Sequence, residues 1–179
     1  MVLAGVMAVA VGLVSPAAAA TPYCGIWWGS LPEVEPGGPV PEGAVVDVRT
    51  GQHDCFDRLV VDLSGATDAY DARYVPRLTA QGSGEPVPLR GGAVLRLIVQ
   101  APAYDDARRP TFLPSDPAEV VDVSGHRTLQ QVAWAGSFEG QTSLGLGTRA
   151  RLPFRVFVLS GNADSSEGAR LVVDVAHEW

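Results

Sequence analysis

The sequence predicts an all-β protein, a sandwich or barrel of about nine to ten short, mostly antiparallel strands. Two observations lead to this class. Apolar residues alternate with polar ones over short stretches, which places the apolar side chains on one face of a strand. Turn-forming residues separate these stretches, and the 20 Gly and 14 Pro are many for a helical protein but ordinary for short strands with tight turns. No stretch shows the period of an amphipathic helix.

The first twenty residues are predicted to be a signal peptide. Residues 2–14 are apolar and uncharged, Ser15 and Pro16 end the run, and small residues follow up to Ala20. This pattern is typical of secretion, with cleavage after Ala20. The alternative is a membrane anchor, but the run is shorter than the roughly 20 residues that span a bilayer. We therefore expect an exported protein with no membrane segment after cleavage.

The length and charge of the mature chain exclude several functions. Cleavage of 20 residues from 179 leaves 159, the length of one domain. The net charge is -7 and there is no block of basic residues, so neither nucleic acid nor an anionic membrane is an expected partner. The two cysteines, Cys24 and Cys55, form an even pair in an exported chain, and we expect one disulfide between them.

Residues 21–43 are predicted to form an extended N-terminal arm, because their Pro and Gly content suits neither a helix nor a central strand. The arm contains Trp27 and Trp28, for which two roles are open. One of them stacks on a sugar ring of a ligand, or at least one of them fills an end of the hydrophobic core. The core position is the commoner role for tryptophan, and we expect it here.

Residues 44–179 are predicted to form the β domain. Its first two strands flank the turn at residues 50–54 and form a hairpin. Pro76 weakens the far end of the third strand, and the polar, Pro-interrupted residues 101–117 form a long loop. The expected strands are 44–49, 55–65, 70–79, 93–100, 119–123, 129–138, 143–148, 154–159 and 169–175.

The stretch Arg-Leu-Val-Val-Asp occurs twice, at residues 58–62 and 170–174. Since side chains alternate along a strand, one face of each copy is apolar and the other carries an Arg and an Asp with a Val between them. A duplicated strand with a charged outer face indicates binding rather than catalysis. The candidate ligand-binding residues are Arg58, Asp62, Arg170, Asp174 and, as an aromatic platform, Trp28.

Two arrangements of the repeated strands fit this pattern. In the first they are antiparallel neighbours, with Arg58 opposite Asp174 and Asp62 opposite Arg170. In the second each strand lies in its own sheet, and the two apolar faces meet across the core. A duplicated motif suggests pseudo-symmetry between two sheets, so we expect the second arrangement.

Catalytic signatures are missing from the sequence. The three histidines, His53, His126 and His177, are each alone in their segments, so no metal site is expected. His53 has acidic neighbours but is read as part of a solvated turn, and His177 as part of a fraying terminus. No Gly-x-Ser-x-Gly motif occurs, and no Gly-rich turn precedes a helix. We expect a non-enzymatic protein without a cofactor.

Several short segments occur in an order that resembles the AMIN-like domain proteins exported by actinobacteria. They are Cys24 with residues 28–32, then residues 51–62, 74–75, 82–84, 138–140, 145–147, 153–156 and 170–175. The resemblance spans nearly all of the mature chain. It implies a β-sandwich, because AMIN domains are β-sandwiches attached to cell-wall amidases and outer-membrane secretins. The amidase catalytic domain with its zinc ligands has no counterpart here.

The resemblance implies a free-standing binding domain of the cell envelope. AMIN domains target their host proteins to peptidoglycan, so we expect a secreted, wall-associated protein that recognises peptidoglycan or another wall component. The alternative is a protein–protein interaction module of the envelope secretion or division machinery. The expected partner is accordingly a cell-wall glycan or an envelope protein.

Overall fold

The computed structural model describes residues 22–37, 43–66, 69–161 and 168–179. The predicted signal peptide and part of the predicted arm lie outside the described residues. The described part is all-β and contains no helix, so it has no helix that is long and apolar enough to cross a membrane.

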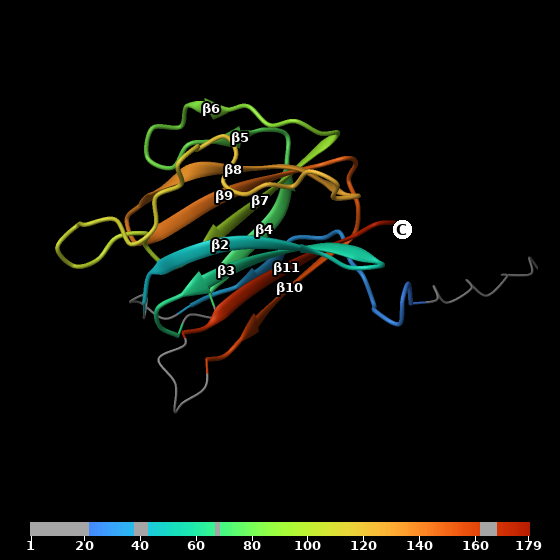
Figure 1. Cartoon of the computed structure of the whole chain (residues 1–179), viewed down its shortest axis with the longest axis horizontal. Coiled ribbons are helices and arrows are strands. Elements are labelled where there is room, and N and C mark those ends of the chain that lie inside the picture. The colour runs from blue at the N-terminus through green and yellow to red at the C-terminus, as the bar shows by residue number, and fades with distance from the viewer. Residues whose placement is uncertain (1–21, 38–42, 67–68, 162–167) are drawn as a thin grey trace, which may run out of the picture.

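Two antiparallel sheets face each other and form a β-sandwich, as predicted (Figure 1). The first sheet has five strands in the order β1 (Glu33–Glu35), β4 (Tyr70–Val75), β7 (Ala93–Val99), β9 (Gln141–Thr148) and β8 (Leu129–Phe138). The second has four strands in the order β10 (Phe154–Leu159), β11 (Arg170–Ala176), β3 (Phe56–Leu63) and β2 (Val45–Gln52). A small hairpin, β5 (Leu78–Thr79) with β6 (Pro86–Val87), lies outside the five-stranded sheet.

The core lies between the two sheets and is built from the inward-facing side chains of their strands. Alternate residues of β3 and β11 enter it, and β7 and β9 supply the facing layer from the other sheet. Burying each such side chain stabilises the fold by roughly 1.5–3 kcal/mol before the cost in conformational entropy. The central buried residues are Leu59, Val61, Leu63, Leu95, Leu97, Leu144, Leu146, Phe154, Leu171, Val173 and Val175.

The expected arrangement of the repeated strands is wrong. The two copies are β3 and β11, which are antiparallel neighbours in one sheet, with Val60 opposite Val172. Arg58 lies opposite Asp174, and Asp62 lies opposite Arg170. Both arrangements bury the same apolar faces, so alternation does not distinguish them. The charge complementarity across the ladder does, because opposite charges stabilise directly facing positions and like charges destabilise them.

Most of the other strands and the first hairpin agree with prediction, but residues 119–123 are not a strand. This segment is a loop that covers the free edge of β8, where the backbone N–H of Val120 donates to the carbonyl of Val132. The loop at 101–117 covers the free edge of β2 in the same way, since Val45 N–H donates to the carbonyl of Pro102. Covered edges protect a sheet from pairing with another chain.

The β5–β6 hairpin covers part of the outer face of the five-stranded sheet. Leu78 is buried there against Ala133 and Ala135 of β8. Its close approach accounts for Gly145 and Gly147 on β9, because a methyl group at either position would collide with the hairpin or the segment that follows it. The four-stranded sheet has no such covering layer among the described residues.

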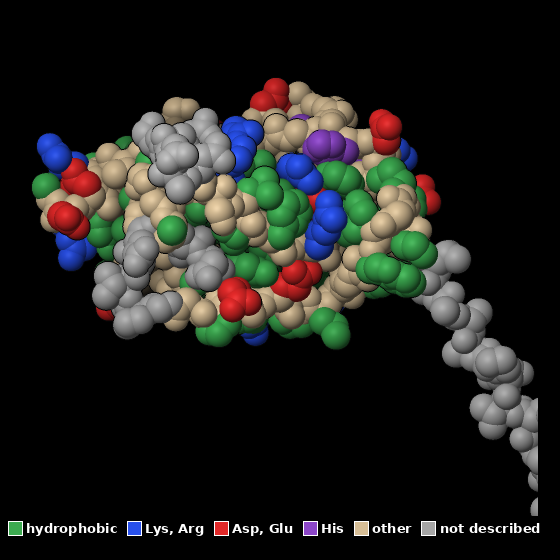
Figure 2. All heavy atoms as spheres, turned by 90° about the horizontal axis from the view of Figure 1, so that it is seen from below, with side chains coloured by type: hydrophobic (Ala, Val, Ile, Leu, Met, Phe, Trp, Pro, Cys, Tyr) green, Lys and Arg blue, Asp and Glu red, His purple; other side chains and the backbone are tan. Residues whose placement is uncertain are grey.

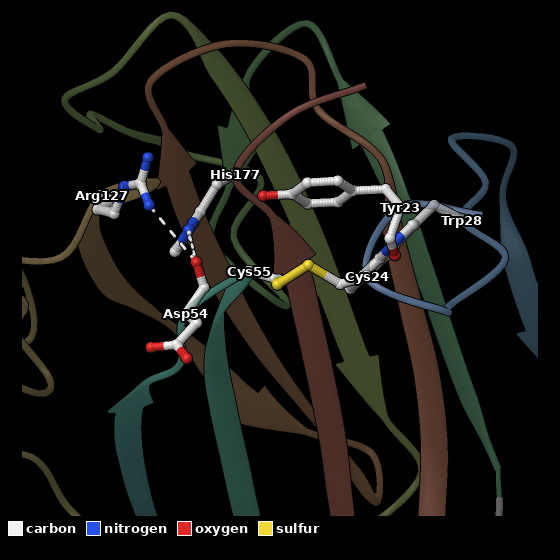
Figure 3. Close-up of a disulfide and its surroundings, with 7 residues drawn as sticks. All are labelled: Tyr23, Cys24, Trp28, Asp54, Cys55, Arg127 and His177. Atoms are coloured by element: carbon white, nitrogen blue, oxygen red, sulfur yellow. Dashed lines mark hydrogen bonds between the residues drawn. A yellow bond between two sulfur atoms is a disulfide. The ribbon is translucent and has the colours of Figure 1, made fainter. Parts of the chain in front are cut away.

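The arm lies against the end and edge of the sandwich, and Cys24 is bonded to Cys55, as predicted (Figure 3). The two Cα atoms are 6.4 Å apart across a sequence separation of 31 residues. Loop-entropy arithmetic assigns such a bond about 3–4 kcal/mol. Further along the arm, Gly29 pairs with Phe154 and β1 pairs with β4, so the arm reaches the edges of both sheets.

Glu33 of β1 closes the free edge of β10, since its carboxylate accepts the backbone N–H of Val156 at 2.9 Å. Burial raises the pKa of Glu33 above its ordinary value of 4.5, and the Val156 hydrogen bond and Arg155 offset only part of this effect. The folded protein therefore binds a proton at Glu33 more tightly than the unfolded chain does. Its contribution to stability is fully present below pH 4.5 and is lost as the pH rises through the raised pKa.

We predict that Glu33→Gln removes this pH-dependent loss, because a Gln side chain stays neutral and still accepts the Val156 N–H. The free energy of unfolding of the variant, relative to wild type, should increase from pH 4 to pH 7 in urea titrations. Glu35→Gln, at an exposed position of the same strand, is the control. A constant difference between Glu33→Gln and wild type across this range would contradict the prediction.

Candidate functional site

The outer face of the four-stranded sheet carries one outward-facing arginine from each strand, and we call it the arginine face. The four are Arg49 of β2, Arg58 of β3, Arg170 of β11 and Arg155 of β10. Figure 2 views the molecule from this side and shows arginine side chains next to hydrophobic ones. All the charged residues predicted as ligand-binding candidates lie on this face.

Asp174 holds two of these arginines at one end of the face. Its carboxylate is fully buried and accepts two hydrogen bonds from Arg58, at 2.6 and 2.9 Å. Arg155 donates to the same carboxylate from the other side, at 2.7 and 2.9 Å. Two arginines around one carboxylate leave a net charge of +1, and bidentate bonds fix both guanidinium planes. The Asp174 carboxylate lies beneath the surface, where it holds the two guanidinium groups.

Aromatic rings line the same two guanidinium groups. The Cζ atom of Arg155 lies 5.0 Å from the centre of the Phe157 ring and 5.4 Å from that of Trp28. Arg58 lies 5.2 Å from the centre of the Phe56 ring. These distances are in the range of cation–π attraction. Flat guanidinium groups and rings therefore form a continuous apolar and cationic surface.

The expected core position of a tryptophan is wrong. Trp27 is 71% exposed, and Trp28 is half-buried on the arginine face, where its ring packs against Phe56 at 5.8 Å. The indole N–H of Trp28 donates to the carbonyl of Tyr23, so the turn that carries Cys24 holds it in place (Figure 3). The disulfide thus positions an aromatic side chain of the candidate site.

The other end of the face is arranged differently. Asp62 accepts two hydrogen bonds from Arg49, at 2.6 and 3.0 Å, and is 21% exposed. Arg170 lies opposite Asp62 in the ladder, but it forms no ion pair with any residue in the described ranges. Two adjoining hollows, of about 420 and 230 Å³, open here, and Arg49 and Arg170 line both of them.

The carboxylates further stabilise the charged form of the two arginines that they bind. The hydrogen bond to Asp174 raises the pKa of Arg58, and the bond to Asp62 raises that of Arg49. A surface of fixed guanidinium groups and aromatic rings can bind oxyanions through paired N–H groups and can stack on flat or cyclic ligand groups. Among the described residues, no group of three or more His, Cys, Asp or Glu is placed to hold a metal ion.

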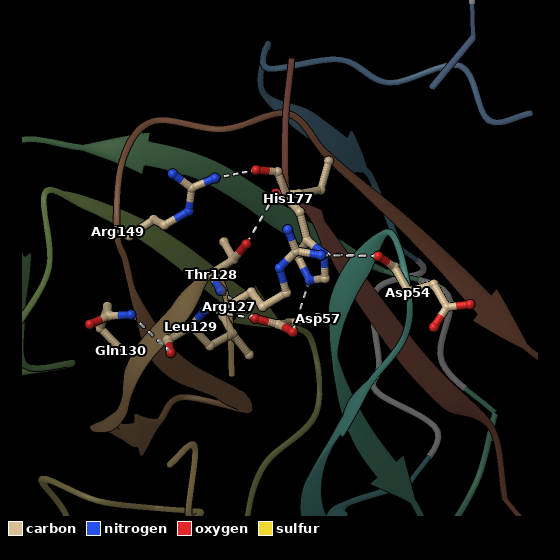
Figure 4. Close-up of polar contacts among 9 residues, drawn as sticks. Asp54, Asp57, Arg127, Thr128, Leu129, Gln130, Arg149 and His177 are labelled. Carbon is tan, nitrogen blue, oxygen red and sulfur yellow. Dashed lines mark hydrogen bonds and ion pairs between the residues drawn. The ribbon is translucent and has the colours of Figure 1, made fainter. Parts of the chain in front are cut away.

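A second polar cluster, at the end of the sandwich, is buried and closed to ligands (Figure 4). Asp57 and His177 are 0% and 1% exposed, and the Nε2 atom of His177 lies 3.1 Å from Oδ1 of Asp57. The expected fraying of His177 is therefore wrong. Its backbone N–H donates to the carbonyl of Cys55, which joins the C-terminal residues to the start of β3. This cluster is structural.

Sequence reasoning missed several residues of the arginine face. The sequence predicts a strand at 154–159 but does not single out Arg155 and Phe157, whose period of two places them on the face opposite Phe154. His53, read as part of a solvated turn, is exposed but stacks on Phe56 with ring centres 4.4 Å apart. Phe56 and Arg49 belong to neighbouring strands of the four-stranded sheet, and only strand pairing brings them to the same face.

The fold is a two-sheet β-sandwich whose four-stranded sheet carries the arginine face. Residues 43–177 match the family model described as the AMIN-like domain, and the chain belongs to that family. The resemblance to the AMIN-like domain is thereby confirmed, and membership of this family indicates a cell-envelope-related binding module. No curated protein and no solved structure matches the chain.

Proposed function

We propose that the protein is a secreted, wall-associated and non-enzymatic domain that binds peptidoglycan through the arginine face. The observation that carries the proposal is the concentration of four arginines and three aromatic rings on one sheet face of a protein whose net charge is -7. The arginines outnumber the aspartates of this face, Asp47, Asp62 and Asp174, so the face is locally positive on an acidic protein.

Peptidoglycan has the chemistry that this face can recognise. Its sugar rings stack on aromatic side chains, and the carboxylates of its peptides match the paired N–H groups of arginine. The disulfide between Cys24 and Cys55 supports a location outside the cytoplasm, where such bonds persist. Membership of the AMIN-like family supports an envelope role.

The test is sedimentation with purified insoluble peptidoglycan. Wild type should sediment and should be released by soluble glycan–peptide fragments. Leu159→Glu places a negative charge beside Arg170, its partner across the ladder, and should abolish sedimentation. Leu113→Glu, at an exposed position of the 101–117 loop, should sediment as wild type does.

The two leucine variants decide whether the arginine face is responsible. Leu159 is 40% exposed and Leu113 is 73% exposed, so neither change buries a charge in the core. Equal sedimentation of both variants would move the binding site away from this face. Failure of the wild-type protein to sediment would refute peptidoglycan binding and favour an envelope protein as partner.

A further inference from the structure

The repeated strands place an approximate two-fold axis between Val60 and Val172. Under this axis Arg58 corresponds to Arg170, and Asp174 corresponds to Asp62. The flanking strands follow this axis in their ion pairs but not in their register: Arg155 of β10 lies opposite Asp174 and binds it, whereas Arg49 of β2 binds Asp62 from a position opposite Val60. The face thus consists of two related sets, each with two arginines and one aspartate.

The two sets also differ in the ion pairs of their aspartates. In the first, Asp174 receives both of its arginines, Arg58 and Arg155. In the second, Asp62 receives Arg49 alone, and Arg170 forms no ion pair within the described part of the chain. Perfect symmetry would direct Arg170 to Asp62. The guanidinium group of Arg170 instead has no carboxylate partner among the described residues.

This guanidinium group lies where the surface is hollow. Arg170 lines both adjoining hollows, and Arg49 borders both of them with it. Arg58 borders the smaller hollow, together with the apolar side chains of Val60 and Val172. Arg49 is held by Asp62 and lies near Asp47, and Arg58 is held by Asp174, so Arg170 is the guanidinium group of these hollows without a carboxylate partner among the described residues. An entering anion would therefore meet an excess of positive charge above an apolar floor.

We propose that Arg170 binds a carboxylate of the ligand. With the ligand bound, both arginines of the second set have a carboxylate partner, as both arginines of the first set have in Asp174. A carboxylate matches the fork of N–H groups on an arginine, and the first set shows this pairing in the same environment. The inference rests on the proposed function and names the ligand group as a carboxylate of the peptide part of peptidoglycan.

The experiment compares native peptidoglycan with peptidoglycan whose carboxylates have been converted to neutral amides. Both are first freed of phosphate polymers, and an untreated wall preparation is measured in parallel. Wild type should bind the amidated material at least about tenfold more weakly than the native material. Arg170→Ala should bind native material with the same weakened affinity and should lose the difference between the two.

Two further variants separate binding from folding. Asp62→Asn releases Arg49 from its carboxylate and should tighten binding to native peptidoglycan but not to the amidated material. Arg77→Ala, which removes an exposed arginine next to the β5–β6 hairpin on the other side of the sandwich, is the matched control and should bind as wild type does. Thermal unfolding of Arg170→Ala should match wild type, because no ion pair of the described residues is lost.

The outcomes distinguish this inference from the proposed function. Equal binding of wild type to native and amidated peptidoglycan would overturn the carboxylate at Arg170 and leave peptidoglycan binding intact. Binding only to the untreated wall would overturn it in favour of a phosphate ligand. No binding to any of the three preparations would refute the proposed function itself.

Discussion

Replacing Asp57 by Ala is expected to lower the free energy of unfolding by about 3–5 kcal/mol, the range seen when one partner of a buried polar pair is removed. Asp57 is fully buried at the end of the core, and its Oδ2 atom accepts the backbone N–H groups of Thr128 and Leu129 at 2.6 and 3.0 Å. Its Oδ1 atom faces His177. Alanine would leave all of these groups buried without partners.

The protonation of His177 follows from its neighbours. Its Nδ1 atom lies 3.2 Å from the carbonyl oxygen of Asp54, which can only accept, so Nδ1 carries a proton. Its Nε2 atom faces the Asp57 carboxyl group, and one proton lies between them. Asp57→Asn can preserve this pattern with a neutral histidine, because its amide N–H₂ donates to Nε2 while its oxygen accepts from the backbone. We therefore expect a smaller loss for Asn than for Ala.

Urea denaturation at pH 7 measures both variants. The control is Asp54→Ala, because Asp54 is exposed and contacts His177 through its backbone carbonyl, which the substitution retains (Figure 4). It should change the free energy of unfolding by less than about 0.5 kcal/mol. A similar loss in the free energy of unfolding for Asp54→Ala and Asp57→Ala would contradict the stabilising role assigned to the buried Asp57 side chain.

Most strands of this fold could be predicted from local sequence, by alternation as in β7 or by a short apolar run as in β10. The pairing of β3 with β11 depends on contacts 112 residues apart, between Val60 and Val172, which alternation does not encode. The loop at 119–123 has the composition of a strand, but it forms only single bonds to the edge of β8.

The candidate site was predictable in part for the same reason. The repeated Arg and Asp positions identify the face, whereas Arg49, Arg155 and Phe157 join it only through strand order. The sequence also gives no sign that Asp174 is buried and Asp62 partly exposed, since the two lie in identical five-residue contexts. Burial is decided by the neighbours of each strand, which here are β10 on one side and β2 on the other.

This difference between two identical motifs leads to the second large effect. Asp174→Ala is expected to lower the free energy of unfolding by about 2–4 kcal/mol, because it leaves Arg58 and Arg155 close together without their shared carboxylate. Both arginines are partly exposed, at 24% and 32%, so water recovers some of the loss. Asp62→Ala removes the corresponding carboxylate, but Arg49 is 51% exposed, and the expected loss is below about 1 kcal/mol.

The matched pair of aspartates is best measured by urea denaturation at low and at moderate salt. Salt should reduce the loss for Asp62→Ala, because exposed charges are screened, and should change the loss for Asp174→Ala much less. Asp174→Ala should also weaken peptidoglycan sedimentation, since Arg155 no longer holds its place between Trp28 and Phe157. Equal losses of stability for the two variants would mean that the two motifs are energetically equivalent. This result would contradict the inference that Asp174 stabilises the fold more than Asp62 does.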